Sequence, residues 1–196
     1  MKPAVFLDRD GTLIEERGYL DRLEDIALFA DTPAALRLLR DAGYALVVVT
    51  NQAGVARGFF DEAFVRKAHR HLAELLARDR IALDGYYYCP HHPDGVIPEY
   101  SRVCRCRKPA PGMVEQAVRD LDIDIGRSFV IGDKWLDVEL ATNAGTSGIL
   151  VRTGYGAGVE ETPPDLSRPA VIVDTILDAA REILRHSARN RRQAHD

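Results

Sequence analysis

Residues 4–12 read AVFLDRDGT, so four apolar residues run directly into two aspartates, a glycine and a threonine. A continuous apolar run of this length is typical of a strand that is buried on both faces of a sheet. Asp8 and Asp10 would then lie two residues apart at the end of that strand, where Gly11 permits the chain to turn. The stretch therefore predicts either an acidic functional site at a strand end or an ordinary acidic turn.

Further apolar runs recur along the chain and alternate with helical patterns. Strands are expected over residues 4–7, 45–49, 86–88, 129–131, 148–151 and 170–173, and helices over 33–42, 61–79, 111–121, 136–144 and 174–185. Residues 91–103 and 153–169 are expected to be irregular. Strands that alternate with helices predict an α/β fold: a three-layer, doubly wound, mainly parallel sheet. In such folds, ligands bind beyond the carboxyl ends of the strands.

Length and charge limit the class of protein. The chain has 196 residues, a hydrophobic fraction of 46% and a formal net charge of −4. These values predict a globular protein without general affinity for nucleic acid or an anionic membrane. No apolar run is long enough to span a bilayer, and the start lacks the pattern of a secretory signal, so we expect a cytoplasmic monomer. We expect one domain over residues 1–185 and an arginine-rich tail over 186–196.

All three cysteines fall in one short segment. Cys89-x-His91 is followed, after twelve residues, by Cys104-x-Cys106. Two pairs of soft or borderline ligands predict a closed, tetrahedral Cys₃His site for a structural zinc ion. The residues alone leave His92 open as the histidine ligand. The alternative to a metal site is three buried cysteines with histidines at the surface.

Residues 89–106, the zinc loop, contain few residues that would pack in a core. A loop of this kind needs a crosslink to become ordered against its backbone entropy, and zinc would provide one. The loop ends directly before Arg107 and Lys108, so the zinc ion is expected to fix the position of both side chains.

Polar residues also follow the second and fourth expected strands. Thr50 follows the second strand, Asp133 follows the fourth, and Lys108 precedes a helix. Each alone has an ordinary interpretation as a turn residue, a helix cap or a surface charge. Because the carboxyl ends of parallel strands share one edge of the sheet, their occurrence together with Asp8 and Asp10 favours a single functional site.

The motifs DRDGT, TNQ, CRKP and GDKWLD resemble the four motifs of the haloacid dehalogenase (HAD) superfamily. The longer set DRDGTL, TNQAGVARG, CPHHP, CRCRKP and GDK is similar to the branch of D-glycero-D-manno-heptose 1,7-bisphosphate 7-phosphatases and histidinol phosphatases. The likeness extends from residue 6 to about residue 156. It implies a HAD-like Rossmannoid fold without a cap domain, since no cap-sized insertion follows either of the first two strands.

The resemblance implies a role for each residue of the strand-end group. Asp8 is expected to attack phosphorus and form an aspartyl phosphate, and Asp10 to act as general acid and then as general base. Thr50 and Lys108 are expected to stabilise the phosphoryl oxygens. Mg²⁺ is the expected catalytic ion, with the carboxylates of Asp8 and Asp133 and the backbone carbonyl of Asp10 as ligands.

A second group of residues is expected to bind the substrate. It comprises Glu16, Arg17, Gly18, Tyr19, Thr50, Asn51, Gln52, Ala53, Arg107, Lys108 and Lys134. Arg107 would recognise a second anionic group or a sugar hydroxyl, because its planar fork suits phosphate. Asp137 is expected to orient Lys134 or the ligands of the metal. Spacing in the family favours His91 over His92 as the zinc ligand.

The resemblance implies a phosphoric monoester hydrolase that removes the 7-phosphate of D-glycero-D-manno-heptose 1,7-bisphosphate and leaves the 1-phosphate. The product would serve ADP-heptose or GDP-heptose synthesis for lipopolysaccharide or another surface polysaccharide. Histidinol phosphate is the alternative substrate. A non-catalytic, zinc-stabilised interaction module is the alternative from another class, but such a module is expected to lack Asp8, Asp10 or Asp133, and all three are present.

Overall fold

The strands of the computed structural model, which describes residues 1–164 and 171–193, form one six-stranded sheet in the order β3-β2-β1-β4-β5-β6. They are β1 (Ala4–Leu7), β2 (Ala45–Asn51), β3 (Gly85–Cys89), β4 (Phe129–Gly132), β5 (Ser147–Val151) and β6 (Val171–Val173). Every neighbouring pair of strands is parallel. This topology confirms the predicted doubly wound α/β fold.

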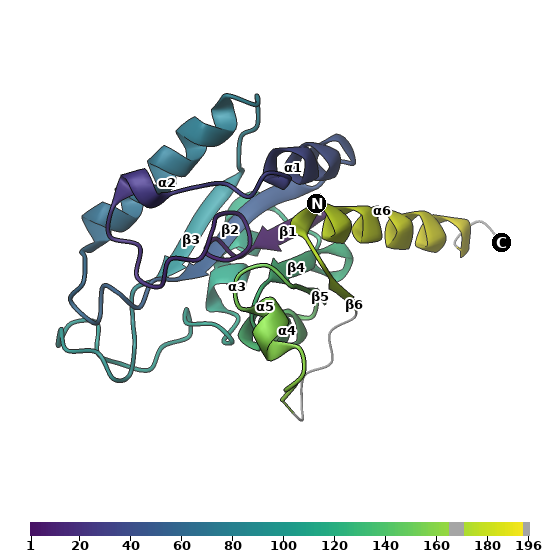
Figure 1. Cartoon of the computed structure of the whole chain (residues 1–196). Helices are drawn as coiled ribbons and strands as arrows, with labels where there is room; N and C mark the ends of the chain where they lie inside the picture. The colour runs from purple at the N-terminus through teal and green to yellow at the C-terminus, as the bar shows by residue number, and fades with distance from the viewer. Residues whose placement is uncertain (165–170, 194–196) are drawn as a thin grey trace.

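The helices form two outer layers, with α1, α2 and α6 on one face of the sheet and α3, α4 and α5 on the other (Figure 1). The helices are α1 (Thr32–Asp41), α2 (Glu62–Ala77), α3 (Gly112–Leu121), α4 (Trp135–Ala144), α5 (Gly156–Val159) and α6 (Ile176–Gln193), with short 3₁₀ turns η1 (Leu23–Asp25) and η2 (Ile125–Arg127). Within the described ranges, no helix is both long and apolar enough to cross a lipid bilayer.

The central strands are packed on both faces by alternate residues, as the continuous apolar runs predict. On one face, Val5, Leu7 and Val48 belong to the core that contains α1, α2 and α6. On the other face, Phe6 and Val47 pack with residues of α3 and α4. All five side chains have no exposed surface. Burial on both sides therefore fixes β1 in the centre of the sheet, with the aspartates at its carboxyl end.

Strand β2 extends two residues beyond its predicted end at Val49. Thr50 and Asn51 continue the ladder by pairing with Tyr88 and Cys89 of β3. The strand was predicted from its apolar run, and that run ends at Val49, before these two polar residues. Because backbone pairing holds both residues, their side chains stand at fixed positions on the carboxyl edge of the sheet.

Two C-terminal segments also differ from expectation. Residues 153–169, expected to be irregular, contain the short helix α5. Helix α6 continues past residue 185 to Gln193, so the described part of the arginine-rich tail is helical. Contacts of the continuation with the body of the protein support it: the ring of His186 packs edge-on against Phe129, and Oγ of Ser187 lies 2.6 Å from Oη of Tyr44. Residues 165–169 of the segment expected to be irregular, residue 170, expected to begin the last strand, and residues 194–196 of the tail lie outside the described residues.

Candidate active site

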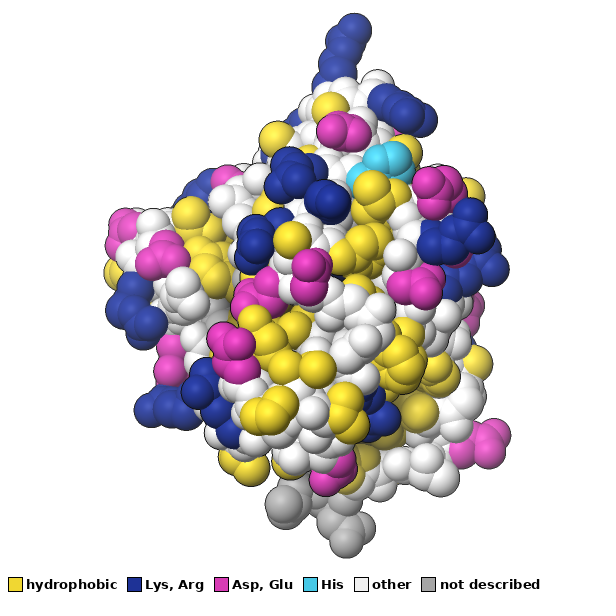
Figure 2. All heavy atoms as spheres, turned by 90° about the vertical axis from the view of Figure 1, so that its left-hand side faces the viewer, with side chains coloured by type: hydrophobic (Ala, Val, Ile, Leu, Met, Phe, Trp, Pro, Cys, Tyr) yellow, Lys and Arg dark blue, Asp and Glu magenta, His cyan; other side chains and the backbone are white. Residues whose placement is uncertain are grey.

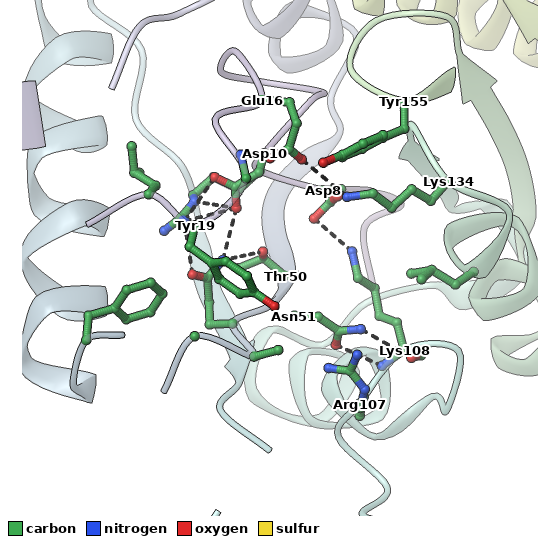
Figure 3. A pocket seen from close by; sticks show the side chains of 18 residues that line it. Asp8, Asp10, Glu16, Tyr19, Thr50, Asn51, Arg107, Lys108, Lys134 and Tyr155 are labelled. Carbon is green, nitrogen blue, oxygen red and sulfur yellow. Dashed lines mark hydrogen bonds and ion pairs between the residues drawn. The ribbon is translucent and has the colours of Figure 1, made fainter. Parts of the chain in front are cut away.

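A cavity of about 350 Å³ lies beyond the carboxyl ends of β1, β2 and β4 (Figure 3). Strand β1 lies between β2 and β4, so the polar residues that follow these strands converge there. The predicted residues that line the cavity are Asp8, Asp10, Glu16, Gly18, Tyr19, Thr50, Asn51, Gln52, Ala53, Arg107, Lys108 and Lys134. Residues that were not predicted also line it: Arg9, Leu20, Gly54, Phe60, Leu136 and Tyr155.

Lys108 bridges two carboxylates on the floor of this cavity. Its Nζ lies 2.8 Å from Oδ1 of Asp8 and 2.6 Å from Oδ1 of Asp137, and it donates a hydrogen bond to the carbonyl of Val49 at 3.1 Å. All three charged side chains are buried. A buried ammonium group requires such partners, because it has lost its hydration.

Asp137 has a partner that was not predicted. Its Oδ1 accepts a hydrogen bond from Lys108 Nζ, and its Oδ2 accepts one from the backbone N–H of Lys134 at 3.2 Å. Both oxygens are thus engaged, and neither binds the ammonium group of Lys134. Asp137 therefore orients Lys108, a contact between residues 29 positions apart in the chain.

Asp8 is held in its ionised form. Burial works to raise the pKa of Asp8, but the charges of Lys108 and Lys134 outweigh burial and leave the pKa below its usual value. In turn, the carboxylates of Asp137 and Asp8 keep the pKa of Lys108 above its usual value despite burial. The strand end therefore presents an anionic oxygen next to a permanent cation at neutral pH, an arrangement suited to attack on a phosphate ester.

Asp133 lies in a cradle beneath the cavity, between two glycines. A Cβ atom on Gly11 would lie 2.2 Å from Oδ2 of Asp133, and one on Gly154 would lie 2.3 Å from the same oxygen. Both glycines have positive φ angles, 83° and 57°. The backbone N–H of Tyr155 donates to Oδ2 at 2.9 Å, whereas Oδ1 is buried and has no hydrogen-bond partner in the described ranges. Oδ1 is therefore available for another ligand.

The carboxylates around this cradle fit a magnesium ion. One oxygen each of Asp8, Asp133 and Asp137 lie within 4.8 Å of one another. Burial, together with the charge of Asp8, raises the pKa of Asp133 to about 7. Burial is the larger cause of this rise, and the rest comes from neighbouring carboxylates that disfavour each other's ionised form. A hard divalent cation that prefers oxygen ligands would relieve this repulsion.

Asp10 accepts hydrogen bonds from Arg9, which was not predicted as a site residue, and from Gln52. Arg9 donates to both of its carboxylate oxygens, and Nε2 of Gln52 donates to Oδ2 at 3.0 Å. Nε2 of Gln52 also lies 2.9 Å from Oγ1 of Thr50. Gln52 was predicted to bind substrate. Although it lines the cavity, its amide is engaged by protein groups.

The predicted substrate loop is fixed by Glu16. Its Oε2 lies 3.3 Å from Nζ of Lys134, which also lies 4.5 Å from the centre of the Tyr155 ring. The structure differs from the prediction at Arg17, which pairs with Glu15 and is not among the cavity-lining residues. The loop therefore contributes Glu16, Gly18 and Tyr19 to the cavity, whereas Arg17 does not line it.

The four predicted zinc ligands converge in the zinc loop. Sγ of Cys106 lies 3.1 Å from Sγ of Cys89, 3.2 Å from Sγ of Cys104 and 3.3 Å from Nδ1 of His91. The three cysteines are free thiols, and the hydrogen bond between Cys106 and Cys89 is the main cause that lowers the pKa of Cys106 to about 5. A thiolate-forming Cys₃His cluster of this size can hold a metal ion, and its ligand set is that of structural zinc.

His92, the other candidate ligand, is engaged elsewhere. Its Nε2 lies 3.3 Å from the guanidinium of Arg57, and its Nδ1 accepts a hydrogen bond from the backbone N–H of Asp94 at 3.1 Å. His91 is the histidine whose ring nitrogen faces the thiols. The geometry therefore favours His91.

The zinc loop and β2 together hold the segment that carries Arg107 and Lys108. Nη1 of Arg107 donates to the backbone carbonyl of His91 at 3.2 Å. The side chain of Asn51 donates to the backbone carbonyl of Lys108 at 3.2 Å and accepts from its backbone N–H at 3.0 Å. Asn51, predicted to bind substrate, thus contacts the main chain next to the active-site lysine.

Removal of a metal ion bound by the Cys₃His cluster is therefore expected to have two effects. Treatment with a zinc chelator should lower the thermal midpoint on the order of 10 °C, because the crosslink orders the loop. It should also raise KM, because Arg107 loses its support. Thermal unfolding and steady-state kinetics measure both. Cys106→Ser is the matched control and should no longer respond to the chelator. An unchanged midpoint after verified zinc loss would contradict a structural metal.

Comparison with known proteins gives the family. A sequence profile described as "Polynucleotide kinase 3 phosphatase" matches residues 3–137, and one described as "HAD-hydrolase-like" matches residues 105–179. The chain is 48% identical over 160 residues to the D-glycero-beta-D-manno-heptose-1,7-bisphosphate 7-phosphatase of Photorhabdus laumondii, covering 81% of this chain and 85% of the relative. The chain belongs to the heptose-bisphosphate phosphatase family of the HAD superfamily.

The similarity to this phosphatase family extends along nearly the whole chain. The D-glycero-D-manno-heptose-1,7-bisphosphate 7-phosphatase of Thermosynechococcus vestitus is 43% identical over 192 residues, covering 95% of this chain and 98% of the relative. The crystal structure of D,D-heptose 1,7-bisphosphate phosphatase from B. bronchiseptica, complexed with magnesium and phosphate, matches with a TM-score of 0.81 at 29% identity, covering 94% of this chain and 99% of that one. The predicted family and the prediction of a HAD-superfamily phosphatase are confirmed.

Proposed function

We propose that this phosphatase hydrolyses the 7-phosphate ester of D-glycero-D-manno-heptose 1,7-bisphosphate and releases heptose 1-phosphate. The observation that carries this proposal is the buried bridge from Lys108 to Asp8 and Asp137, beside the Asp133 cradle. It keeps a carboxylate ionised next to a cation that can bind phosphoryl oxygens. Relatives at 43–48% identity that are named for this reaction support the choice of substrate over histidinol phosphate.

In the first step, an oxygen of Asp8 attacks phosphorus, and the bond between phosphorus and the C7 oxygen breaks. Asp10 donates a proton to the departing oxygen, so the sugar leaves as a neutral alcohol. Lys108 and Thr50 hold the phosphoryl oxygens as negative charge moves onto them. The products of this step are the sugar and an aspartyl phosphate on Asp8.

In the second step, Asp10 takes a proton from a water molecule that attacks the phosphorus of the aspartyl phosphate. The bond between phosphorus and Asp8 breaks, inorganic phosphate leaves, and the Asp8 carboxylate is restored. Mg²⁺ held by Asp8, Asp133 and the backbone carbonyl of Asp10 would offset the repulsion between carboxylates and phosphate. Asp8 and Asp10 thus end the cycle in their starting forms.

Arg107 is proposed to recognise the second anionic group of the substrate. It lines the cavity next to Lys108, as Figure 3 shows. The planar donor fork of arginine suits the 1-phosphate. Zinc in the Cys₃His cluster is proposed to hold Arg107 there through the carbonyl of His91.

A small sugar phosphate is a better substrate for this surface than a polynucleotide. Figure 2 shows acidic and basic side chains interspersed over the face of the molecule that lies on the left of Figure 1. A polynucleotide would favour a continuous basic stripe, and the net charge of the chain is −4. We propose that the enzyme acts as a monomer in the cytoplasm, where its thiols stay reduced, without a nucleic-acid or membrane partner.

A panel of phosphate esters tests the substrate. With Mg²⁺ present, kcat/KM for heptose 1,7-bisphosphate is expected to exceed that for histidinol phosphate at least about 100-fold, since only the former offers a second phosphate. Both anomers of the bisphosphate belong in the panel. Arg107→Met should raise KM for the bisphosphate about tenfold or more and change p-nitrophenyl phosphate hydrolysis little. A higher kcat/KM for histidinol phosphate would contradict the proposed substrate.

A further inference from the structure

Arg9 is a buried arginine in the wall of the active-site cavity. Only 2% of its surface is exposed, although arginine is almost never buried to this extent unless it is paired. It stands between Asp8 and Asp10 at the end of β1, and the reaction steps above give it no role. Its burial therefore requires an explanation in its contacts.

Those contacts converge on the Asp10 carboxylate. Arg9 Nη2 donates to Oδ1 of Asp10 at 3.0 Å, and Nε donates to Oδ2 at 3.1 Å. Gln52 binds both residues: its Oε1 accepts from Arg9 Nη2 at 3.1 Å, and its Nε2 donates to Oδ2 of Asp10 at 3.0 Å. Arg9 and Gln52 together form a clamp on the Asp10 carboxylate. Two oxygens bound by a planar fork cannot rotate independently of it. The carboxylate plane of Asp10 is therefore fixed from the protein side.

The buried side chains of His69 and Tyr86 near Arg9 do not provide a second negative charge. Nη1 of Arg9, Nε2 of His69 and Oη of Tyr86 are buried and have no hydrogen-bond partner in the described part of the chain. The rings of His69 and Tyr86 stack, with centroids 5.1 Å apart. Burial and the charge of Arg9 lower the pKa of His69 to about 3, so the imidazole is neutral. In the described ranges, Asp10 is the one carboxylate with an ion pair to Arg9.

We propose that Arg9 is a positioning residue that, together with Gln52, aims the Asp10 carboxylate at the oxygen of the leaving group. As the bond between phosphorus and that oxygen breaks, the proton moves from Asp10 to the oxygen, and the Arg9 fork stabilises the carboxylate that remains. This inference rests on the roles proposed above for Asp8 and Asp10. It adds that the proton transfer depends on a side chain that acts through Asp10.

The dependence of rate on the leaving group tests this role. A sugar alkoxide needs a proton to leave, whereas p-nitrophenolate is stable without one. The constant kcat/KM covers the steps up to transfer of the phosphoryl group to Asp8. Arg9→Met should lower kcat/KM for heptose bisphosphate about 100-fold but for p-nitrophenyl phosphate less than about threefold. Arg9→Lys should recover part of the loss, because one ammonium group supplies charge without the fork.

Matched variants separate positioning from a general structural effect. Gln52→Leu removes the second residue of the clamp. It should lower kcat/KM for heptose bisphosphate less than Arg9→Met does, again with little change for p-nitrophenyl phosphate. This variant therefore tests the positioning role if Arg9→Met does not fold. Arg119→Met changes an exposed arginine of α3 and should leave both rates unchanged. An equal loss for both substrates in folded variants, or no loss for the bisphosphate, would overturn the role of Arg9.

Asp10→Asn distinguishes failure of this inference from failure of the proposed mechanism. If Asp10→Asn lowers kcat/KM equally for heptose bisphosphate and p-nitrophenyl phosphate, Asp10 is not the general acid. The proposed role of Arg9 is then overturned as well. If Asp10→Asn is selective and Arg9→Met is not, the proposed function stands and Arg9 alone is overturned. Selectivity in both variants supports the positioning role.

Discussion

Replacement of Asp8 by asparagine is expected to lower kcat for phosphate release by about 10⁴-fold or more, because the amide cannot serve as the nucleophile that forms the aspartyl phosphate. The variant should remain folded. Lys108 keeps its partner Asp137 at 2.6 Å, and Asp133 loses the charge of Asp8 that helps raise its pKa. Phosphate-release assays and thermal unfolding measure the two quantities.

An exposed aspartate provides the control for Asp8→Asn. Asp41, at the end of α1, has a side chain with 61% of its surface exposed and pairs with Arg40 next to it in the chain. Asp41→Asn should retain the wild-type rate, since its ion pair lies at the surface. Turnover of Asp8→Asn at more than a few per cent of the wild-type rate, in protein free of wild-type enzyme, would exclude Asp8 as the nucleophile.

Lys108→Met is expected to damage both stability and catalysis. It leaves the carboxylates of Asp8 and Asp137 buried without their shared cation, which should lower the free energy of unfolding by about 3–5 kcal/mol. It also removes a cation from the phosphoryl oxygens, which should lower kcat on the order of 10²–10³-fold. Denaturant unfolding and steady-state kinetics measure these losses. Lys67→Met, on the exposed side of α2, should change stability by less than about 0.5 kcal/mol.

The loss of stability in Lys108→Met should depend on pH. Burial already raises the pKa of Asp137 to about 6 even though Lys108 lowers it, so the pKa should rise further in the variant. When folding raises the pKa of a carboxyl group, the folded protein loses stability as the pH rises from the unfolded-state pKa to the folded-state pKa. The stability difference from wild type should therefore grow between about pH 5 and pH 8. A difference independent of pH would show that Lys108 does not compensate these carboxylates.

The features predicted well from sequence are those that local patterns determine. The run AVFL specifies a strand buried on both faces, and the residues that follow each such strand must meet at one edge of a parallel sheet. Asp8 and Thr50 line one cavity for this reason, and Asp133 lies close to Asp8. The Cys₃His cluster likewise follows from two ligand pairs joined by a loop that is poor in core residues.

The features that sequence did not predict depend on long-range contacts. The ammonium group that Asp137 binds is that of Lys108, 29 residues away, whereas Lys134 or the ligands of the metal were expected. Asn51 and Gln52 line the cavity as expected, but their amides bind Lys108 and Asp10. Composition cannot show whether an amide faces a substrate or the protein.

Arg9 was missed for another reason. Arginine is normally assigned to the surface, and only the buried fork to Asp10 shows otherwise. The same expectation treated the arginine-rich C-terminal segment as a tail, although its described part continues helix α6. In that segment, the helix is held by contacts of His186 with Phe129 and of Ser187 with Tyr44, which are distant in the sequence.

Chemical trapping of the aspartyl phosphate tests the central claim most directly. The enzyme is mixed with Mg²⁺ and substrate, quenched in acid during turnover and reduced with borohydride, and the peptide that contains residues 4–12 is sequenced by mass spectrometry. Attack by Asp8 predicts that residue 8 is converted to homoserine only when substrate is present, and that Asp10 is unchanged. Turnover at the wild-type rate with no modification at residue 8, or with modification at another carboxylate, would contradict a phospho-enzyme on Asp8.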